Sequence, residues 1–324
     1  MSRWSAVSTT LCLLLLVGHA SGAEPVRDEG SPSWWRPVYL ADYGSVIASA
    51  ALLGGLRRID PSSAAMIGPS FSEDDWEAIL DPAYDDEIGY PHTPESVPEV
   101  VLAPIAGGGL VGIMVMEWIP GLNGLDEVDG QLVHDAVLGY LEALTWTLAL
   151  SELFKVTVGR LRPDFQDRAV RYHCGTLGQN DGICAGFVGE PLSAEEYRRG
   201  RKSFVSSHAS LTFAVASYWN LIIGGRLVWG ERASADTRAV GVWMQSALLT
   251  GATLVSISRI VDRRHHAGDV AAGAGIGIGL AAAAYFRHFG LDGLPRSRAS
   301  KEGKAELALG PSAQGLGLGL SGRF

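Results

Sequence analysis

The sequence predicts an all-α fold: a membrane-embedded bundle of about six helices, followed by a small C-terminal β-hairpin. Hydrophobic residues make up 47% of the 324 residues and charged residues only 19%, which favours a membrane protein or an unusually apolar globule. Apolar runs of helical length recur along the chain, and the alternation typical of β-strands is absent before residue 306. The remaining polar residues gather in clusters at the boundaries of these runs.

The charge balance argues against a nucleic-acid partner. The formal net charge is −9, and the basic residues are concentrated from Lys155 onward. No surface that combines aromatic and basic residues is evident. Any anion-binding site must therefore be local.

Residues 1–23 are predicted to be a secretory signal peptide. Arg3 supplies a positive start, residues 11–17 form a short apolar run, and residues 21–23 are small enough for cleavage. The alternative is an uncleaved N-terminal anchor, although the apolar run is short for a membrane span.

Residues 24–98 are expected to contain one helix and a long extracytoplasmic connection. Residues 38–56 are small and apolar, and could be either a membrane span or a buried helix. From residue 59 to residue 98, prolines alternate with acidic groups, a composition typical of a surface connection.

Residues 99–290 are predicted to form the helical core. The last of its apolar runs is rich in Gly and Ala, which permits close contact between helices in lipid or in a soluble core. The helices are expected at residues 99–119, 132–154, 209–223, 240–260 and 270–286.

Two environments stay open for this core, a membrane and the soluble periplasm. Ionisable side chains interrupt the apolar runs, and each would cost roughly a few kcal/mol if it faced lipid. Arginine-rich connections, in contrast, follow the positive-inside rule for cytoplasmic loops. If the signal is cleaved and residues 38–56 also span the membrane, each later helix would cross the membrane in the direction opposite to the one expected from its connections. The ionisable residues are Glu117, His134, Asp135, Glu142 and Glu152.

Residues 291–324 are predicted to be a tail that contains the small hairpin. Leu316, Leu318 and Leu320 alternate with glycine after Pro311, which is the period of a strand. Outer-membrane barrels also end in a strand with a terminal Phe, but no other barrel strands are evident in the chain.

Cys174 and Cys184 are predicted to form a disulfide. They are the cysteines that remain after signal cleavage, because Cys12 lies in the signal's apolar run. An even pair beyond an export signal indicates an oxidising compartment. Two free thiols are the alternative, and no spacing suited to zinc is present.

The first of three polar clusters covers residues 155–163. Lys155 and Arg162 are seven residues apart, or two helical turns, so we expect both to lean over one face of a helix that Pro163 ends. Two cations placed in this way can bind an anion. Ordinary compensation of the helix dipole is the alternative.

The second cluster, residues 203–210, is rich in serine and opens an apolar helix. Backbone N–H groups at a helix start bind anions, Ser206 adds a hydroxyl, and His208 is placed to exchange a proton with a bound group. The alternative is a plain N-cap at Ser206 with a surface histidine.

The third cluster covers residues 258–269. Arg259 offers a fork-shaped cation for phosphate oxygens. His265 and Asp269 are four residues apart and share a helix face if the turn continues into the next helix. The carboxylate could then hold one imidazole nitrogen and leave the other free to attack. His266 lacks this spacing and is expected to be structural; salt-bridge decoration of the whole cluster is the alternative.

In order, the clusters show Lys-x6-Arg-Pro, Ser-x-His and Ser-Arg-x5-His-x3-Asp. This signature resembles that of the type 2 phosphatidic acid phosphatase and vanadium haloperoxidase superfamily. Flanking residues at 88–98, 159–165 and 200–204 are similar to those of its lipid phosphate phosphatase branch. The resemblance covers roughly residues 85–290. It implies that the core is a catalytic domain of six membrane helices with the site on the extracytoplasmic side.

The resemblance also implies a role for each matched residue. His265 would be the nucleophile, oriented by Asp269, and His208 the acid that protonates the leaving alcohol and then activates water. The family's second motif usually contains Pro-Ser-Gly-His, so Val205 and Ser207 are departures, and a side chain at 207 could crowd the pocket. The phosphate would be bound by Lys155, Arg162, Ser206, the amide of Ser207, and Arg259.

These inferences predict a phosphatase that hydrolyses lipid phosphate monoesters, either phosphatidic acid-like or prenyl, or their diphosphate relatives, through a phosphohistidine. No metal or cofactor is expected, because three fixed cations could neutralise the phosphate. The expected partners are the lipid substrate and a bacterial inner membrane, with the active site facing the periplasm. The alternatives are a soluble periplasmic acid phosphatase, a vanadate-dependent haloperoxidase, and an inactive binding or scaffold protein.

Overall fold

The computed structural model describes residues 37–59, 96–119, 130–176, 178, 184, 189–230, 233–291, 293–295, 306–312 and 315–321. The predicted signal peptide at residues 1–23 and most of the proline-rich connection lie outside the described residues. The predicted division into residues 1–23, 24–98, 99–290 and 291–324 therefore stays a prediction.

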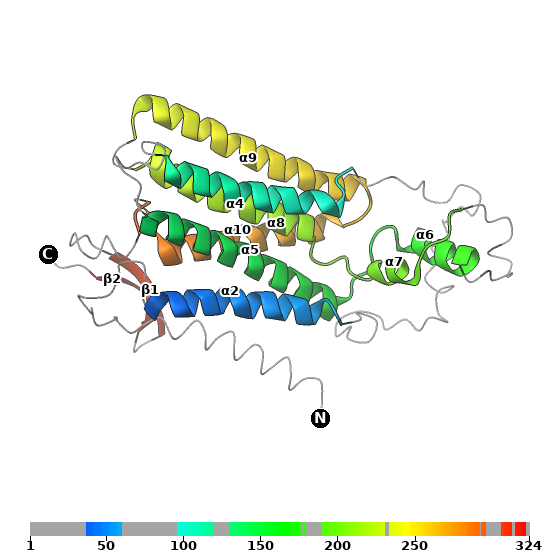
Figure 1. The fold of residues 1–324 in the computed structure, drawn as a ribbon. Coiled ribbons are helices and arrows are strands. Elements are labelled where there is room, and N and C mark those ends of the chain that lie inside the picture. Colours follow the sequence, from blue (N-terminus) through cyan, green and yellow to red (C-terminus); the bar gives the residue numbers. More distant parts are fainter. Residues whose placement is uncertain are drawn as a thin grey trace.

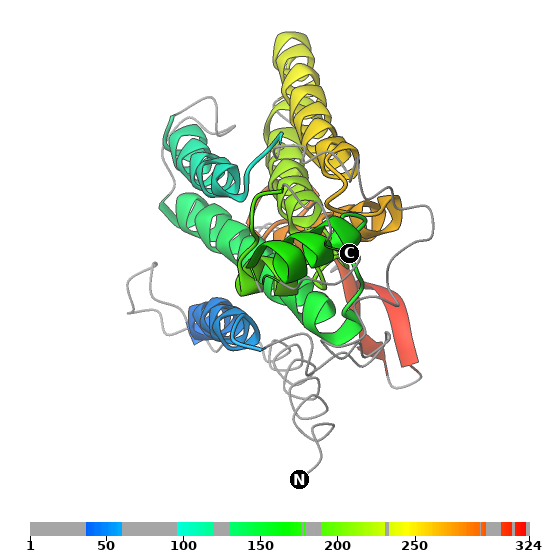
Figure 2. The same cartoon turned by 90° about the vertical axis from the view of Figure 1, so that its right-hand side faces the viewer.

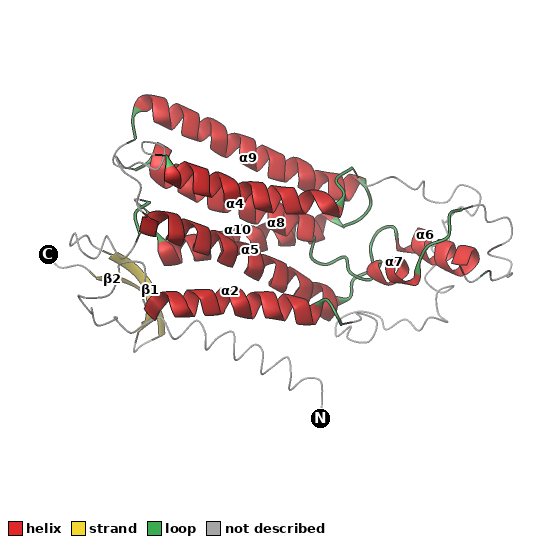
Figure 3. Cartoon of the chain, viewed as in Figure 1, coloured by secondary structure: helices red, strands yellow, loops and turns green. Residues whose placement is uncertain are grey.

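The long helices of the described chain run side by side and form the body of the molecule (Figures 1 and 3). α8 lies at the centre and packs against α10, α9, α5 and α4, whereas α2 packs chiefly on α5 at the edge (Figure 2). The predicted all-α bundle is confirmed. Its helices are α2 (Pro37–Leu56), α4 (Leu102–Trp118) after the 3₁₀ turn Glu99–Val101, α5 (Gly130–Val158), α8 (Ser207–Ile223) with the π-helical extension Gly224–Val228, α9 (Ala235–Val261) and α10 (Ala267–His288).

Five helical segments are long and apolar enough to cross a membrane. Apolar side chains on their outer faces, such as Val115, Trp243 and Leu254, are exposed, as they would be in contact with lipid tails. The chain is thus a membrane protein, as the sequence predicts. The five segments are Glu99–Trp118, Gly130–Val158, Ser207–Val228, Ala235–Val261 and Ala267–His288.

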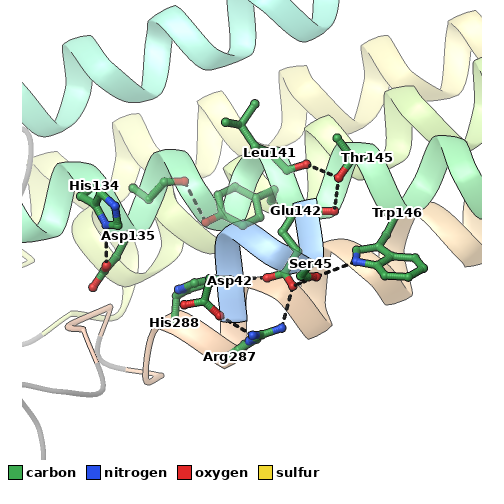
Figure 4. Close-up of polar contacts among 12 residues, drawn as sticks. Asp42, Ser45, His134, Asp135, Leu141, Glu142, Thr145, Trp146, Arg287 and His288 are labelled. Carbon is green, nitrogen blue, oxygen red and sulfur yellow. Dashed lines mark hydrogen bonds and ion pairs between the residues drawn. The ribbon is translucent and has the colours of Figure 1, made fainter. Parts of the chain in front are cut away.

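The ionisable side chains within the apolar runs are paired with other polar side chains. Glu142 of α5 accepts hydrogen bonds from Ser45 of α2 at 2.6 Å and from Arg287 of α10 at 2.7 Å (Figure 4). Glu117 forms a buried ion pair with Arg226 at 3.3 Å. Pairing removes the cost of exposing these groups to lipid, which was the sequence argument against spanning. The remaining pairs are Glu152 with Lys202 and Asp135 with His134.

Close contact between α8 and α10 places their N-terminal turns next to each other. A Cβ at Gly277 would lie 2.1 Å from the carbonyl oxygen of Ser210, and a Cβ at Gly273 would lie 2.7 Å from that of Ser206. Only glycine lets two helix backbones approach this far. The Gly- and Ala-rich run thus provides the close helix contact that the sequence predicts.

Two short helices, α6 (Phe165–Val170) and α7 (Ala194–Arg199), project from one end of the bundle (Figures 1 and 2). A π-helical turn, Arg171–Thr176, follows α6. The rings of Phe165 and Tyr197 stack with centroids 5.5 Å apart. The disulfide Cys174–Cys184 lies in the segment between α6 and α7.

A two-stranded antiparallel hairpin occupies the place where the sequence predicts one. β1 (Glu306–Ser312) pairs with β2 (Gly315–Ser321), with Glu306 opposite Ser321 and Ser312 opposite Gly315. It lies toward the end of the bundle opposite to α6 and α7 (Figure 1).

Candidate active site

The structure brings the three predicted clusters together at the end of the bundle from which α6 and α7 project (Figure 1). Lys155 lies in the last turn of α5, Ser206 caps the start of α8, and Arg259 lies in the last turn of α9. His265 lies just before α10. These helices alternate in direction, so ends that are far apart in the sequence meet.

The first cluster does not lie on one helix face. α5 ends before Pro163 because Gly159 adopts a φ of +61° and turns the chain out of the helix. Arg162 therefore lies in a loop. The prediction that Arg162 and Lys155 share one face of a helix is wrong. The backbone N–H of Arg162 donates to the carbonyl of Gly200 at 2.8 Å, which fixes this loop.

The second cluster forms the open first turn of α8. The buried side-chain oxygen of Ser206 accepts a hydrogen bond from the amide of Ala209 at 3.4 Å, so Ser206 is the N-cap. Ser207 begins the helix, and its hydroxyl accepts a hydrogen bond from the Lys155 ammonium at 2.6 Å. The side chain that departs from the family motif thus contacts one of the expected phosphate ligands.

His208 has one ring nitrogen held and one available. The ring hydrogen bonds to the backbone of Pro98, while Nε2 is buried and has no partner among the described residues. A carbonyl oxygen can only accept, so Nδ1 is the atom that donates to it. Nε2 is therefore available to exchange a proton with a bound group.

His265 has the same arrangement. Its Nδ1 lies 2.7 Å from the carbonyl oxygen of Ser203 and must donate to it, which leaves a lone pair on Nε2. Burial, and then the charges of Arg162 and Lys155, hold the pKa of His265 well below its ordinary value of 6.5. The imidazole is neutral at neutral pH, as a nucleophile must be.

Asp269 is placed differently from the sequence prediction. α10 begins at Ala267, so His265 precedes the helix and shares no helical face with Asp269. The carboxylate lies 3.9 Å from the His265 Nδ1. It accepts shorter hydrogen bonds from the Ser203 hydroxyl at 2.5 Å and from the Arg160 guanidinium at 2.9 Å. Asp269 thus reaches the imidazole through Ser203.

Arg259 completes the positive charge of the site. It is 1% exposed, and its Nη1 donates to the carbonyl of Val97 at 2.5 Å. Together with Lys155 and Arg162, it acts electrostatically on both His208 and His265. A phosphate at this place would meet three cations and two histidines.

Comparison with known families fits this arrangement. Residues 136–291 match the model of the PAP2 superfamily. This part of the chain is a PAP2 superfamily domain. All the predicted catalytic and phosphate-binding residues, from Lys155 to Asp269, lie within the PAP2 domain.

Curated relatives of the chain include proteins named lipid phosphate phosphatase and phospholipid phosphatase, as the sequence predicts. A PA-phosphatase related-family protein of Dictyostelium discoideum is 25% identical over 80% of this chain and 83% of its own length. Lipid phosphate phosphatase 1 of Arabidopsis thaliana is 33% identical over 47% of this chain, and phospholipid phosphatase 1 of Mus musculus is 27% identical over 58%. The match spans 44% of the Arabidopsis protein and 67% of the mouse protein. No solved structure matches the chain.

The site also contains residues to which the sequence analysis gave no role. Ser203 and Arg160 lie inside the predicted clusters, but no spacing rule distinguishes them from their neighbours. Val97 and Pro98, outside the PAP2 match, contribute backbone carbonyl groups. His266, predicted to be structural, is the N-cap of α10 and places its Nε2 3.1 Å from the carbonyl of Leu161.

Proposed function

We propose that the protein hydrolyses lipid phosphate monoesters of the phosphatidic acid or prenyl phosphate kind, or their diphosphate relatives, through a phosphohistidine intermediate. One observation carries the proposal: two buried histidines, each with Nδ1 held by a peptide carbonyl, lie among three cations at one end of a PAP2 domain. Relatives named lipid phosphate phosphatase and phospholipid phosphatase support the substrate class.

The phosphate would be bound by charge and by the start of α8. Lys155, Arg162 and Arg259 supply positive charge, while the Ser206 hydroxyl and the Ser207 amide lie where a helix N-terminus attracts anions. Three fixed cations can offset the charge of a phosphate monoester without a metal ion. Among the described residues, no three His, Cys, Asp or Glu side chains are grouped to hold a metal.

The reaction would proceed in two displacements. The Nε2 lone pair of His265 attacks phosphorus while the ester oxygen departs and takes a proton from the Nε2 of protonated His208. Neutral His208 then accepts a proton from water, whose oxygen attacks phosphorus. The P–N bond breaks, the electron pair returns to His265, and inorganic phosphate leaves with His208 protonated again.

The position of the site supports a lipid substrate and an extracytoplasmic orientation. The site lies where the apolar helices end, which is the depth of phospholipid headgroups in a bilayer. The disulfide Cys174–Cys184 lies in the segment beyond this same end, and disulfides persist in oxidising compartments. We assign the site to the periplasmic face of a bacterial inner membrane.

Phosphate release from purified protein tests the proposal. We expect release from phosphatidic acid and prenyl phosphates in the presence of EDTA, and a loss of about 10³-fold or more with His265→Ala. An acid-labile, base-stable phosphoprotein should be trapped during turnover of the wild type. Full activity of His265→Ala, or a strict requirement for added metal, would refute the mechanism.

A further inference from the structure

Residues 96–98 lie outside the PAP2 match, yet Val97 and Pro98 bond active-site side chains, and Ser96 bonds Asp262 of the third cluster. Ser96 donates two hydrogen bonds to Asp262, from its hydroxyl to Oδ1 at 2.5 Å and from its backbone N–H to Oδ2 at 2.9 Å. Asp262 is 4% exposed, follows the last residue of α9 and has no role in the mechanism above. A buried carboxylate bonded twice to one residue fixes the position of that residue.

The two following carbonyl groups hold two functional side chains. The carbonyl of Val97 accepts from Arg259 Nη1 at 2.5 Å, and Pro98 forms the backbone hydrogen bond to the His208 ring. A carbonyl on one imidazole nitrogen selects the tautomer and the ring orientation, which determines where the other nitrogen points. Without this bond, the His208 ring could turn and carry Nε2 away from the ester oxygen.

We infer that residues 96–98 are a positioning segment of the active site, anchored by Asp262, which orients His208 as the general acid. The inference rests on the proposed phosphatase function. It adds Ser96 and Asp262 as positioning residues, neither of which touches the substrate. An ordinary loop attachment would show the same contacts but would have no selective effect on proton donation.

The basicity of the leaving group separates these two roles. A general acid matters most when the departing oxygen is strongly basic, as in the alcohol of a lipid phosphate, and little when it is a weakly basic phenolate. The parameter kcat/KM reports the steps up to departure of the leaving group, so it excludes hydrolysis of the phosphohistidine. The ratio of kcat/KM for a short-chain phosphatidic acid to that for p-nitrophenyl phosphate therefore measures proton donation by His208.

Ser96→Ala is the decisive variant because Ser96 is exposed and its backbone bond to Asp262 remains. We expect kcat/KM to fall about tenfold more for phosphatidic acid than for p-nitrophenyl phosphate, because a shift of Arg259 would affect both substrates alike whereas loss of proton donation would not. Ser96→Thr keeps the hydroxyl and should restore the wild-type ratio. His208→Ala removes the general acid itself, so it gives the largest expected effect: a fall of about 10²-fold or more in the ratio of kcat/KM for phosphatidic acid to that for p-nitrophenyl phosphate. Asp262→Asn should change the ratio in the same direction as Ser96→Ala.

Ser193→Ala is the matched control. It makes the same change at the exposed N-cap of α7, whose hydroxyl bonds only to Glu196 among the described residues. An equal loss on both substrates in Ser96→Ala, or no loss on either, overturns the inference while the phosphatase proposal stands. A wild type that releases phosphate from neither substrate overturns both. If Asp262→Asn fails to fold, the two Ser96 variants decide alone.

Discussion

His265 donates its Nδ1 hydrogen to the carbonyl of Ser203, and the hydroxyl of the same serine donates to Asp269. The carbonyl fixes the tautomer as a carboxylate would but carries no full negative charge, and the Asp269 carboxylate stays 3.9 Å from Nδ1. The charge of Asp269 is balanced by Arg160 instead. This arrangement keeps His265 oriented and neutral at once.

The pH dependence of the free enzyme follows from this residue. Burial and the cations Arg162 and Lys155 lower the pKa of His265, so the neutral, nucleophilic form persists below pH 6.5 and is lost only at lower pH. We predict that the acid limb of kcat/KM lies below pH 6.5. The measurement is a pH profile with p-nitrophenyl phosphate, corrected for the ionisation of the substrate. An acid limb of the enzyme at or above 6.5 would contradict the burial of the His265 ring beside these cations.

At the scale of single residues, the sequence predicts which side chains form the site but not which groups bond them. Lys155, His208 and His265 could be selected because their types and spacings are visible in the chain. The groups that hold the two imidazole rings are the peptide carbonyls of Ser203 and Pro98, and every residue has such a carbonyl. No sequence pattern shows which of them meets a histidine, so these partners required the structure.

At the scale of elements, the long helices could be predicted and the short ones could not. An apolar run of twenty residues is visible in the composition alone. α6 and α7 have six residues each, too few to be stable by helix propensity, and depend on local contacts such as the capping box of Ser193 and Glu196. Such contacts are recognised only once the fold is known.

α2 lies outside the PAP2 match. It is attached to α5 and α10 by polar contacts (Figure 4). Glu142 is at the centre of these contacts and bonds Ser45, Arg287 and His288. Arg287 also pairs with Asp42. Buried polar groups that lose a partner are costly, so this network should determine how firmly α2 is docked.

Glu142→Gln tests this role. The change removes one of the two carboxylate charges that offset Arg287, which is partly exposed, so we predict a loss of about 2 kcal/mol in the free energy of unfolding. Thermal unfolding in detergent measures it. The parameter kcat/KM should change little, because Glu142 lies far from the active site: along α5 it is about 20 Å from Lys155, at 1.5 Å per residue.

Glu195→Gln is the matched control for this prediction. Glu195 pairs with Arg199 at 2.6 Å on the exposed surface of α7, where an ion pair contributes less than about 1 kcal/mol. Equal destabilisation by the two substitutions would show that the α2 network adds nothing beyond a surface pair.

For the whole molecule, charge and disulfide chemistry support the proposed orientation. The disulfide segment lies beyond the end of the bundle that carries the site. At the other end of α9, the sequence before this helix contains Arg232, and Arg238 lies in its first turn, as the positive-inside rule expects on the cytoplasmic side. α9 has 27 residues, so its ends are about 40 Å apart, enough to cross a bilayer.

Two variants, each with one added cysteine, test this orientation in intact bacterial cells. Ser193 and Ser234 are exposed N-cap residues of α7 and α9, at opposite ends of the bundle. We predict that a membrane-impermeant maleimide labels Ser193→Cys without permeabilisation and labels Ser234→Cys only after it. The unsubstituted chain is the control for labelling of its own cysteines. The reverse pattern would place the site in the cytoplasm, where the disulfide would be reduced and the substrate would have to come from the inner leaflet.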